Sequence, residues 1–546
     1  MSADHIRYRV DAGRPISPAA RGMASLDMRD RDALFDALGA KTFDVAIIGG
    51  GITGGGIARD AALRGLSVAL VEAGDFASGT SSRSSKMIHG GLRYLAQGDL
   101  ALVREAASER KIVQAIAPHL AMETPFVIPA RSAAAIAKLR AGLWTFEKLG
   151  GVAKDHAHQV WSTAELAERE PALAAAGLAG AVVYPEFLTN DARLTLANLQ
   201  SAAEHGAVIV NYASAERLTG EPLASADIAD ADEPGRRTRI AAKVFVNAAG
   251  PWVDAIRALE SAAAAPKLAL SRGIHIVFPR ALAPVTRTLI VPAGNRRSIF
   301  IVPKGAVTYI GTTDAFHDGA ETWPVIGRED IDYLLSATNA ALGGRPLHAR
   351  QITAAWAGAR PLVAEPGKGA SETSRRDEIW QGPGGMLSIA GGKLTAYRRM
   401  AERVVDRVET ELGRKPSRCR TASEPLPGGE TPTRTVGAQL AGLGLEALAA
   451  ERLVGLYGAA APLVAGGPAM EAERAVLSEG ALTLEDYWVR RGARAWFDAD
   501  GGIASLQPAA LAMAPLLGWT DAQTAAQIVA CQHRQAIDLE AAHSQP

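Results

Sequence analysis

Residues 48–65 read IGGGITGGGIARDAALRG, and this stretch decides the fold. A strand-like apolar run, FDVAII, begins at Phe43 and leads into it. An alanine-rich helix and a second apolar run, SVALVE, follow. A strand, a glycine-rich turn, a helix and a further strand in this order form one βαβ unit. The sequence therefore predicts that a Rossmann-like parallel sheet begins here.

Three glycines of this stretch, Gly49, Gly51 and Gly54, have the spacing G-x-G-x-x-G. In such a turn the first glycine permits the tight bend, the second lets the backbone approach a pyrophosphate, and the third lets the helix pack on the strand. Glu72 ends the next strand, where its carboxylate can accept hydrogen bonds from two ribose hydroxyls. Because that carboxylate would repel the extra phosphate of NADP, the motif predicts NAD or FAD and leaves the choice between them open.

Composition excludes several functional classes. The 546 residues are enough for two or three domains, and 58 Lys and Arg balance 58 Asp and Glu, so no overall field favours nucleic acid. The two cysteines, Cys419 and Cys531, are too few for a disulfide framework, a zinc site or an iron–sulfur cluster, so we expect no metal and a reducing cytoplasm. We expect neither a spanning helix nor export, since no run approaches 18 apolar residues and the N-terminus lacks the apolar core of a signal peptide.

The pattern along the chain indicates three regions. Residues 1–40 are polar with two early prolines, so we expect an extension outside the fold. Residues 41–425 hold irregularly spaced strand-like runs, several of them in hairpin-like order, which predicts an α/β (overall α+β) region with an antiparallel-sheet substrate domain interleaved, mainly within 126–180 and 256–385. A Pro/Gly-rich segment, EPLPGGETP at 424–432, suggests a boundary before a C-terminal helical domain, residues 430–546.

Residues 79–95, GTSSRSSKMIHGGLRYL, bear on the choice between NAD and FAD. Their hydroxyl groups can donate to a pyrophosphate and a ribityl chain that lie along the backbone, although the serines alone would also fit an ordinary polar loop. The run His89-Gly90-Gly91 makes the loop less favoured, because paired glycines permit the close approach of a flat ring. The segment therefore favours a flavin.

With these motifs the chain closely resembles the FAD-dependent, membrane-associated glycerol-3-phosphate dehydrogenases. The resemblance includes the helix motif through Asp60, Arg64 and Gly65, where we expect Asp60 and Arg64 to form a surface salt bridge. A second family signature, GGKLTAYRRMA, occupies residues 391–401, and between the two lie, in family order, SSKMIHGGLRYL, LTNDARL, VNAAGPWVD, GTTD and AGARPL. The resemblance runs from about Phe43 into the C-terminal domain, with only the N-terminal extension outside it.

The resemblance implies a fold, a cofactor and a reaction. It implies an FAD-binding domain of the glutathione-reductase/D-amino-acid-oxidase type and oxidation of sn-glycerol 3-phosphate to dihydroxyacetone phosphate. Hydride would pass from C2 to FAD, and electrons would then pass to a membrane quinone such as ubiquinone. The residues expected to contact FAD are Gly49, Gly51, Gly54, Glu72, Thr80, Ser81, Ser82, Ser85, His89, Gly90, Gly91, Gly250, Gly392, Lys393, Leu394 and Thr395.

A substrate with a dianionic phosphate requires several cations, among which arginine offers bidentate geometry. Lys393 begins a helix, where the macrodipole disfavours a cation by up to about 1 kcal/mol unless a bound anion offsets that cost. The motifs supply as substrate-binding candidates Arg93, Tyr94, Arg360, Arg376 and Lys393. The doublet Arg375-Arg376, where the family has one arginine before aspartate, leaves open which of the two binds phosphate.

Oxidation of a secondary alcohol also needs a base for the hydroxyl proton. We expect His275, in GIHIVFP where the family places an active-site histidine, to be the base, with His89 as the alternative. Arg360 would help to polarise the C2 oxygen. A second departure from the family is Lys304, where an aromatic residue is common, and it could alter the polyol accepted.

Reoxidation by quinone would require peripheral contact with the inner face of the cytoplasmic membrane. Residues 133–149, AAAIAKLRAGLWTFEKL, could form an interfacial helix, although the pattern also suits a core helix. A homodimer is possible, and no nucleic acid is expected as partner. Three alternatives stay open: a glycerol-3-phosphate oxidase that forms peroxide, a dehydrogenase of another polyol phosphate, and a flavin scaffold without turnover, against which the intact set of cations and histidines argues.

Overall fold

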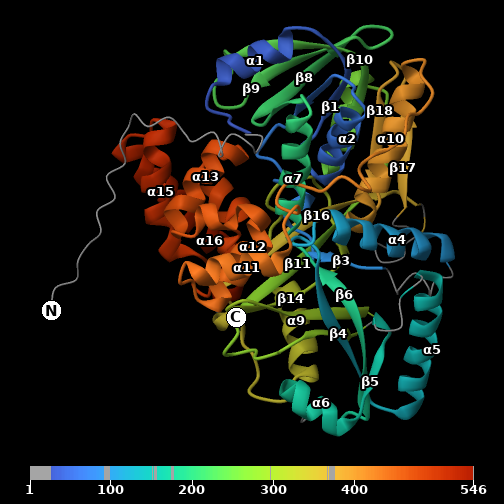
Figure 1. Ribbon diagram of the computed structural model, residues 1–546, viewed down its shortest axis with the longest axis vertical. Helices are drawn as coiled ribbons and strands as arrows, with labels where there is room; N and C mark the ends of the chain where they lie inside the picture. Colours follow the sequence, from blue (N-terminus) through green and yellow to red (C-terminus); the bar gives the residue numbers. More distant parts are fainter. Residues whose placement is uncertain are drawn as a thin grey trace.

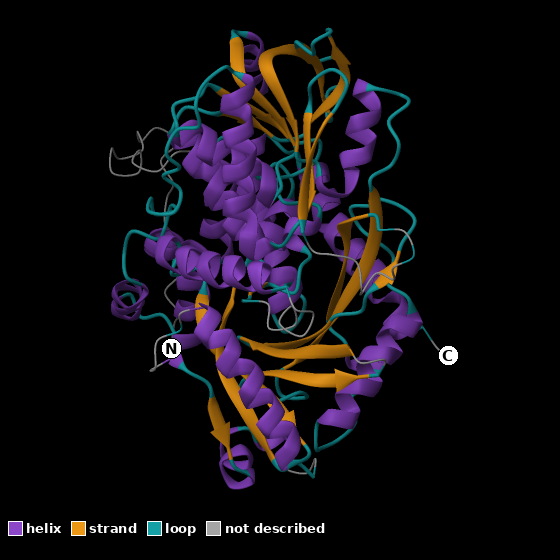
Figure 2. Ribbon diagram, turned by 90° about the vertical axis from the view of Figure 1, so that its right-hand side faces the viewer, coloured by secondary structure: helices purple, strands orange, loops and turns teal. Residues whose placement is uncertain are grey.

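The computed structural model describes residues 26–90, 99–150, 152, 156–173, 177–294, 297–365, 367 and 376–544. These residues form a dinucleotide-binding sheet with its helices, a second sheet below it, and a group of C-terminal helices that lies beside both (Figure 1). The turned view separates the two sheets and shows helices packed between and around them (Figure 2). The expected combination of a Rossmann-like domain, an antiparallel sheet and a helical C-terminal region is confirmed.

The first sheet contains the predicted βαβ unit. Strand β1 (Thr42–Ile48) pairs in parallel with β2 (Val68–Val71), and α2 (Ile52–Leu63) connects them. Parallel pairing continues from β2 to β7 (Val208–Val210) and from β1 to β10 (Arg237–Asn247) and β18 (Leu387–Gly391). Three antiparallel strands complete this sheet in the described residues: β8 (Ala213–Thr219), β9 (Ser225–Asp230) and β17 (Asp377–Gln381).

Alternation along β1 sends its side chains into two cores. Val45 and Ile47 pack with α2, α7 (Asp191–Glu204) and α10 (Tyr397–Glu411). Ala46 and Ile48 face the opposite core, which also takes in α1 (Arg31–Gly39) through Phe35 and Leu38. The fold therefore begins earlier than the expected boundary at residue 40, because the apolar face of α1 covers the sheet.

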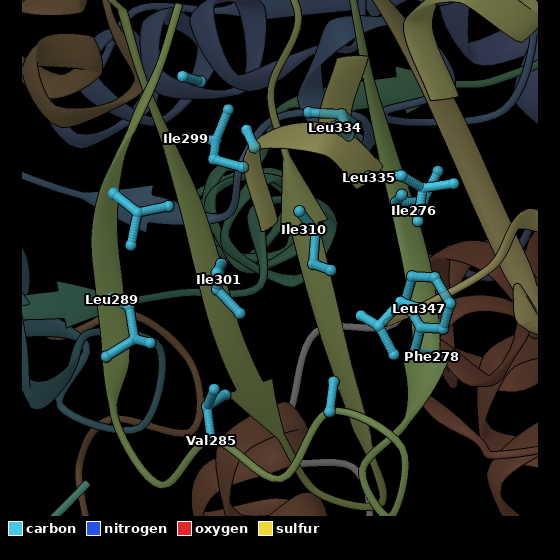
Figure 3. Packing of buried hydrophobic residues seen from close by; sticks show 14 of the residues in the cluster. Ile276, Phe278, Val285, Leu289, Ile299, Ile301, Ile310, Leu334, Leu335 and Leu347 are labelled. Carbon is cyan, nitrogen blue, oxygen red and sulfur yellow. The ribbon is translucent and has the colours of Figure 1, made fainter. Parts of the chain in front are cut away.

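The substrate sheet has the order β15-β11-β14-β13-β12-β4-β6-β3 in the described residues, with β16 also on β11 and β5 on β6. Its pairs are antiparallel except β12 with β4. One face packs on α9 (Arg328–Ala341), and Figure 3 shows Ile276, Ile299 and Ile310 of this face close to Leu334 and Leu335. The strands span Met87–Ile88 (β3), Met122–Ala130 (β4), Gln159–Trp161 (β5), Gly180–Leu188 (β6), Leu268–Pro279 (β11), Thr288–Ala293 (β12), Arg297–Lys304 (β13), Val307–Gly311 (β14), Ala315–Phe316 (β15) and Ala354–Val363 (β16).

The C-terminal helices contact the substrate sheet through β16 and also the segment that precedes α1. Near β16, His543 Nε2 lies 3.0 Å from the Ile352 carbonyl oxygen, and ahead of α1 the Leu26 amide donates to the Ser478 carbonyl at 3.2 Å. These helices are Thr433–Gly442 (α11), Ala447–Tyr457 (α12), Pro468–Glu479 (α13), Arg494–Phe497 (α14), Ile503–Leu517 (α15) and Asp521–His543 (α16). The remaining helices are Leu100–Ile116 (α4), Ala133–Gly150 (α5), Thr163–Arg169 (α6) and Val253–Glu260 (α8).

Two helical stretches bear on membrane contact. Helix α5 forms where the interfacial helix was expected, but Leu143 and Phe146 are buried and, of its large apolar residues, Trp144 is the one that is prominently exposed, at 58%. By length and composition alone, Ala447–Val464 could cross a membrane, yet 56% of this stretch is buried inside the fold, as in a core helix of a globular domain.

The Asp60–Arg64 pair lies in the interior and not on the surface, contrary to our expectation. Arg64 Nη2 lies 2.6 Å from Asp60 Oδ2, and both side chains are fully buried. Arg64 also contacts Asp406 and Glu409 of α10, which covers this side of α2. The pair therefore joins two helices of the dinucleotide-binding domain.

Candidate active site

The glycine turn after β1 leaves no room for side chains. A Cβ atom at Gly54 would lie 1.9 Å from the Gly49 carbonyl oxygen, and Gly49 has a φ of +118°. Gly51 is the N-terminal cap of α2, and the next amide, of Ile52, donates to Ser81 Oγ at 2.9 Å. The turn thus exposes backbone at a helix N-terminus, which is the arrangement that accommodates a pyrophosphate.

Glu72 lies beside this turn. Its Oε2 accepts a hydrogen bond from the Gly50 amide at 2.7 Å and its Oε1 one from the Gly74 amide at 2.9 Å. Burial raises the pKa of Glu72, against the effect of these two amides. Each carboxylate oxygen retains a second lone pair, so the group can still accept hydrogen bonds from ribose hydroxyls.

The hydroxyl-rich segment connects the glycine turn to the substrate sheet. Thr80 Oγ1 donates to the Ala359 carbonyl of β16 at 2.6 Å, and Ser85 Oγ lies 2.9 Å from His275 Nε2 of β11. The Ser82 hydroxyl is buried with no hydrogen-bond partner among the described residues. A glycine cradle, a carboxylate beside it and a buried hydroxyl without a hydrogen-bond partner among the described residues together fit FAD.

The two signature segments meet in space. Thr395 Oγ1 accepts a hydrogen bond from the His89 amide at 3.2 Å and donates one to the His89 carbonyl at 3.1 Å. Gly391 and Gly392, with φ of +77° and +74°, turn the chain after β18, and Lys393 follows immediately before the 3₁₀ turn Leu394–Ala396. Lys393 and His89 therefore belong to one locality.

Glu186 of β6 supports this locality and was missed from the sequence. Its carboxylate accepts hydrogen bonds from the Gly90 amide at 3.1 Å and from Arg110 at 2.8 Å. Burial raises the pKa of Glu186, while Arg110 and Lys393 act in the opposite direction. The available signal was a carboxylate inside the apolar run VVYPEFL, which argues for a buried partner.

His275 and Arg360 extend over one face of the substrate sheet, at places where glycines make room. A Cβ atom at Gly311 would lie 2.1 Å from the His275 ring, and one at Gly273 would lie 2.0 Å from Arg360 Nη2. The pairings of Gly311 with His275 on β14 and β11, and of Arg360 with Ser271 on β16 and β11, put all of these positions on the same face. Ser85 packs on this face. Its hydroxyl contacts His275, and its carbonyl accepts a hydrogen bond from the Tyr309 hydroxyl at 3.1 Å.

The environment of His275 favours the neutral imidazole. Its ring stacks on Trp356 at 4.6 Å between centroids, with an interplanar angle of 10°. Burial, and then the nearby charges of Arg360 and Lys86, hold the pKa of His275 well below 6.5. A neutral imidazole can accept a proton, so the group is chemically able to act as a base.

The guanidinium of Arg360 is oriented by the GTTD segment. Nη1 donates to Asp314 Oδ1 at 2.9 Å, and Nη2 donates to Thr312 Oγ1 at 2.8 Å. The sequence marks this segment as a family motif, but its residues were not expected to have a role of their own. Its carboxylate and hydroxyl fix the fork of donors that an anion or a polarised oxygen would meet.

A buried ion pair closes the site from the side of α7. Lys86 Nζ donates to Asp191 Oδ1 and to the Ser82 carbonyl, both at 2.7 Å. The ammonium also lies 4.7 Å from the ring centroid of Trp496 in the C-terminal domain. Both charged residues fall in the noted motifs SSK and LTNDARL, but only the tertiary fold shows that they pair.

Other predicted site residues are placed differently or fall outside the described ranges. Arg376 is paired with Asp99 at 2.8 Å, and its side chain is 63% exposed. Gly250 turns the chain with a φ of +57° just after β10. Gly91, Arg93, Tyr94 and Arg375 lie outside the described residues.

Comparisons with known proteins agree with this geometry. The profile of the family described as FAD dependent oxidoreductase matches residues 44–398, and that of the C-terminal domain of alpha-glycerophosphate oxidase matches residues 419–524. Aerobic glycerol-3-phosphate dehydrogenase of Staphylococcus epidermidis is 40% identical over 416 residues, 74% of each chain, and that of Staphylococcus aureus 41% over 398 residues, 71% of each.

Solved structures show the same fold. The glycerol-3-phosphate dehydrogenase from Bacillus halodurans, complexed with FAD, superposes with a TM-score of 0.78 at 30% identity and covers 95% of this chain and 100% of its own. L-alpha-glycerophosphate oxidase from Mycoplasma pneumoniae has a TM-score of 0.54 at 16% identity, covering 70% of this chain and 98% of its own, which is a likeness of fold alone.

Proposed function

Because this chain belongs to the family of FAD-dependent glycerol-3-phosphate dehydrogenases, we propose that it oxidises sn-glycerol 3-phosphate to dihydroxyacetone phosphate. Its cofactor is FAD. The observation that supports the reaction most strongly is the convergence of His275 and Arg360 over glycine-lined positions of the substrate sheet, next to the hydroxyl-rich segment. A neutral base and a fixed cation in one place are what oxidation of a phosphorylated secondary alcohol requires.

Each residue of this site has a proposed task. When bound, FAD supplies the acceptor for the hydride that leaves C2. Arg360 polarises the C2 oxygen, and His275 Nε2 takes the hydroxyl proton once the hydrogen bond with Ser85 is exchanged for one with substrate. His89 remains the alternative base.

The phosphate group is assigned to a separate set of cations. Lys393 supplies one positive charge at the turn beside His89. We assign the second to Arg93, with Tyr94 as a hydrogen-bond donor. Arg376 is a weaker candidate, because Asp99 already holds its guanidinium. An arginine and a lysine on different segments would fix the position of the phosphate and thereby present C2 to the flavin.

For the electron acceptor we propose a membrane quinone such as ubiquinone, reached by peripheral contact with the cytoplasmic face of the membrane. The relatives from Staphylococcus are named dehydrogenases and not oxidases, which favours an acceptor other than oxygen. On α5, Lys148 Nζ lies 5.8 Å from the ring centroid of the exposed Trp144. An exposed aromatic ring beside a lysine suits the membrane interface.

A second candidate is an oxidase of the same substrate. It is favoured by one observation, the match of residues 419–524 to the C-terminal domain of alpha-glycerophosphate oxidase. Oxygen would then replace quinone and hydrogen peroxide would be formed. A dehydrogenase of another polyol phosphate would use the same cations with a different fit around the carbon chain.

One experiment separates these functions. Purified holoprotein is mixed with sn-glycerol 3-phosphate without oxygen, and a soluble quinone analogue or oxygen is added after the flavin has bleached. Bleaching followed by fast reoxidation with quinone and slow reoxidation with oxygen supports the dehydrogenase. Fast reoxidation by oxygen with one peroxide per flavin establishes the oxidase. Bleaching by another polyol phosphate but not by sn-glycerol 3-phosphate would overturn the substrate assignment.

A further inference from the structure

The segment that follows Glu72 is held by the C-terminal domain. Asp75 is only 2% exposed, and both of its carboxylate oxygens accept hydrogen bonds from arginines of the π-helical turn Asp486–Arg491. Arg491 Nη2 donates to Asp75 Oδ1 at 2.8 Å, while Arg491 Nη1 and Arg490 Nε donate to Asp75 Oδ2. Arg490 and Arg491 lie more than 400 positions from Asp75 in the sequence, yet both bind its carboxylate. Asp75 itself comes three residues after Glu72, the carboxylate assigned to the ribose.

Apolar contact at Phe76 reinforces this connection. A Cβ atom added at Gly50 would lie 2.9 Å from Phe76 Cδ1, and one added at Gly480 would lie 3.1 Å from Phe76 Cε2. The ring is thus in van der Waals contact with the dinucleotide turn on one side and the C-terminal domain on the other. Asn211 adds a polar contact, since its Nδ2 donates to the Gly480 carbonyl at 2.8 Å.

The backbone of the segment transmits this contact to the glycine turn. The Ala77 amide donates to the Gly50 carbonyl at 3.1 Å, and the Gly50 amide donates to Glu72 at 2.7 Å. Glu72 and Gly74 are themselves joined by a hydrogen bond. Movement of Asp75 would therefore shift both the carboxylate at the ribose position and the backbone that faces the pyrophosphate.

The charges around Asp75 form a paired set, which also includes the partly exposed Glu485 at 3.1 Å from Arg490 Nη1. Arg490 Nη2 donates to Asp486 Oδ1 at 2.7 Å, and the Tyr212 hydroxyl donates to the same oxygen at 2.8 Å. Burial opposes ionisation of Asp75, but the two guanidiniums outweigh it and keep the pKa of this carboxyl below its usual range. Buried groups that are fully paired hold their geometry tightly, because each alternative position leaves a charge without a partner.

We propose that Arg490 and Arg491 are positioning residues for FAD, through which the C-terminal domain locks residues 72–78 in the conformation that binds the cofactor. The C-terminal helices are then part of the FAD site and not an independent module. The inference rests on the proposed function only in placing the ribose of FAD at Glu72.

The chain offers a matched control for this role. Arg193 of α7 also forms a buried ion pair with the C-terminal domain, with Nη1 and Nη2 both donating to Glu479. The guanidiniums of Arg193 and Arg491 are comparably buried, at 5% and 0% exposure of the residue. Arg193 bonds to Glu479 and the Leu456 carbonyl and not to residues 72–78. Glu479 also accepts hydrogen bonds from Arg491 through its carbonyl oxygen, so removal of Arg193 disturbs the same interdomain contact without removing a direct bond to residues 72–78.

The test measures FAD binding to full-length apoprotein by quenching of FAD fluorescence, for wild type, Arg491→Met, Arg193→Met and Glu72→Ala. We expect the Kd for FAD to rise about tenfold or more in Arg491→Met, as for coupled sites. We expect it to stay within about twofold of wild type in Arg193→Met, as for a site without direct coupling. The midpoint temperature of thermal unfolding of the apoprotein should be lower than that of wild type in both arginine variants.

Equal Kd values for Arg491→Met and Arg193→Met would overturn the inference. An unchanged Kd in Glu72→Ala would instead show that the ribose is not bound at Glu72, which overturns the placement on which the inference rests. If Arg491→Met does not fold, the comparison is made between Arg491→Lys and Arg193→Lys, which keep the charge but lose the forked geometry. A weaker Kd for Arg491→Lys alone supports the inference, and equal values refute it.

Discussion

Thr395 and His89 are 306 positions apart and share two hydrogen bonds, from the His89 amide to Thr395 Oγ1 and from Thr395 Oγ1 to the His89 carbonyl. The hydroxyl therefore satisfies both backbone groups of one residue. Because Thr395 follows Lys393 and His89 precedes Gly90, this contact joins the two segments that carry the family signatures. It also keeps the proposed phosphate-binding lysine next to the flavin segment.

Replacement of Thr395 by valine should loosen this junction. Valine has the same shape but cannot form a hydrogen bond, so the two bonds between the buried Thr395 hydroxyl and the His89 backbone are lost; Thr395 is 1% exposed. We expect the free energy of unfolding to fall by about 1–3 kcal/mol. Urea unfolding of the apoprotein measures this. Thr338→Val is the control, because the one hydrogen bond that Thr338 Oγ1 forms among the described residues is to the Leu334 carbonyl of its own helix. An equal loss of stability in both variants would show that the bonds to His89 have no special weight.

A methyl group at Gly273 should disable the site without removing the cofactor. The added Cβ would lie 2.0 Å from Arg360 Nη2, so the guanidinium must leave its position. We expect kcat/KM to fall by about 100-fold in Gly273→Ala, as for a misplaced catalytic group, with the FAD content unchanged. Gly437→Ala is the matched control, since nothing lies within 4 Å of its added Cβ. Normal kcat/KM in Gly273→Ala would show that Arg360 is not needed where it lies.

The pH profile should lack a histidine limb at neutral pH. His275 has a pKa well below 6.5, first because it is buried and then because Arg360 and Lys86 are near. The reactive, neutral form therefore persists as pH falls through 6.5 and is lost only at more acid pH. We expect the rate of flavin reduction at subsaturating substrate to stay level from about pH 7.5 down to about 6.5, the ordinary histidine pKa.

Stopped-flow flavin reduction across this range measures the profile, with His275→Gln as the comparison. The groups that face the imidazole are Ser85, Arg360, Lys86, Tyr309 and Trp356. The charged groups among them, Arg360 and Lys86, are cations, and both favour the neutral imidazole. An acid limb centred at or above 6.5 that disappears in His275→Gln would contradict a depressed pKa.

The sequence could predict what depends on neighbouring residues. The βαβ unit at residues 42–71 follows from apolar periodicity and glycine spacing, both of which act locally. The proximity of Glu72 to the glycine turn has the same local origin, since a parallel strand ends at the same edge of the sheet as the turn. The helical C-terminal region likewise follows from its alanine- and leucine-rich composition.

Contacts between distant segments could not be predicted in this way. The pair Lys86–Asp191 and the bond from Glu186 to Gly90 depend on which strands become neighbours in the substrate sheet. Periodicity gives no information about that order. The burial of Asp60 and Arg64 was likewise misjudged, because an i, i+4 pair looks the same in sequence whether or not a second helix covers it.

The central claim is that hydride leaves C2 of sn-glycerol 3-phosphate for the flavin of this protein. The most direct test is anaerobic stopped-flow reduction of the holoprotein by this substrate carrying deuterium at C2, compared with unlabelled substrate and with substrate deuterated at C1. If hydride leaves C2, the flavin bleaches with all three substrates and only the C2 label slows the bleaching, by severalfold. No bleaching, or bleaching at one rate with all three substrates when the chemical step limits the reaction, would contradict hydride transfer from C2.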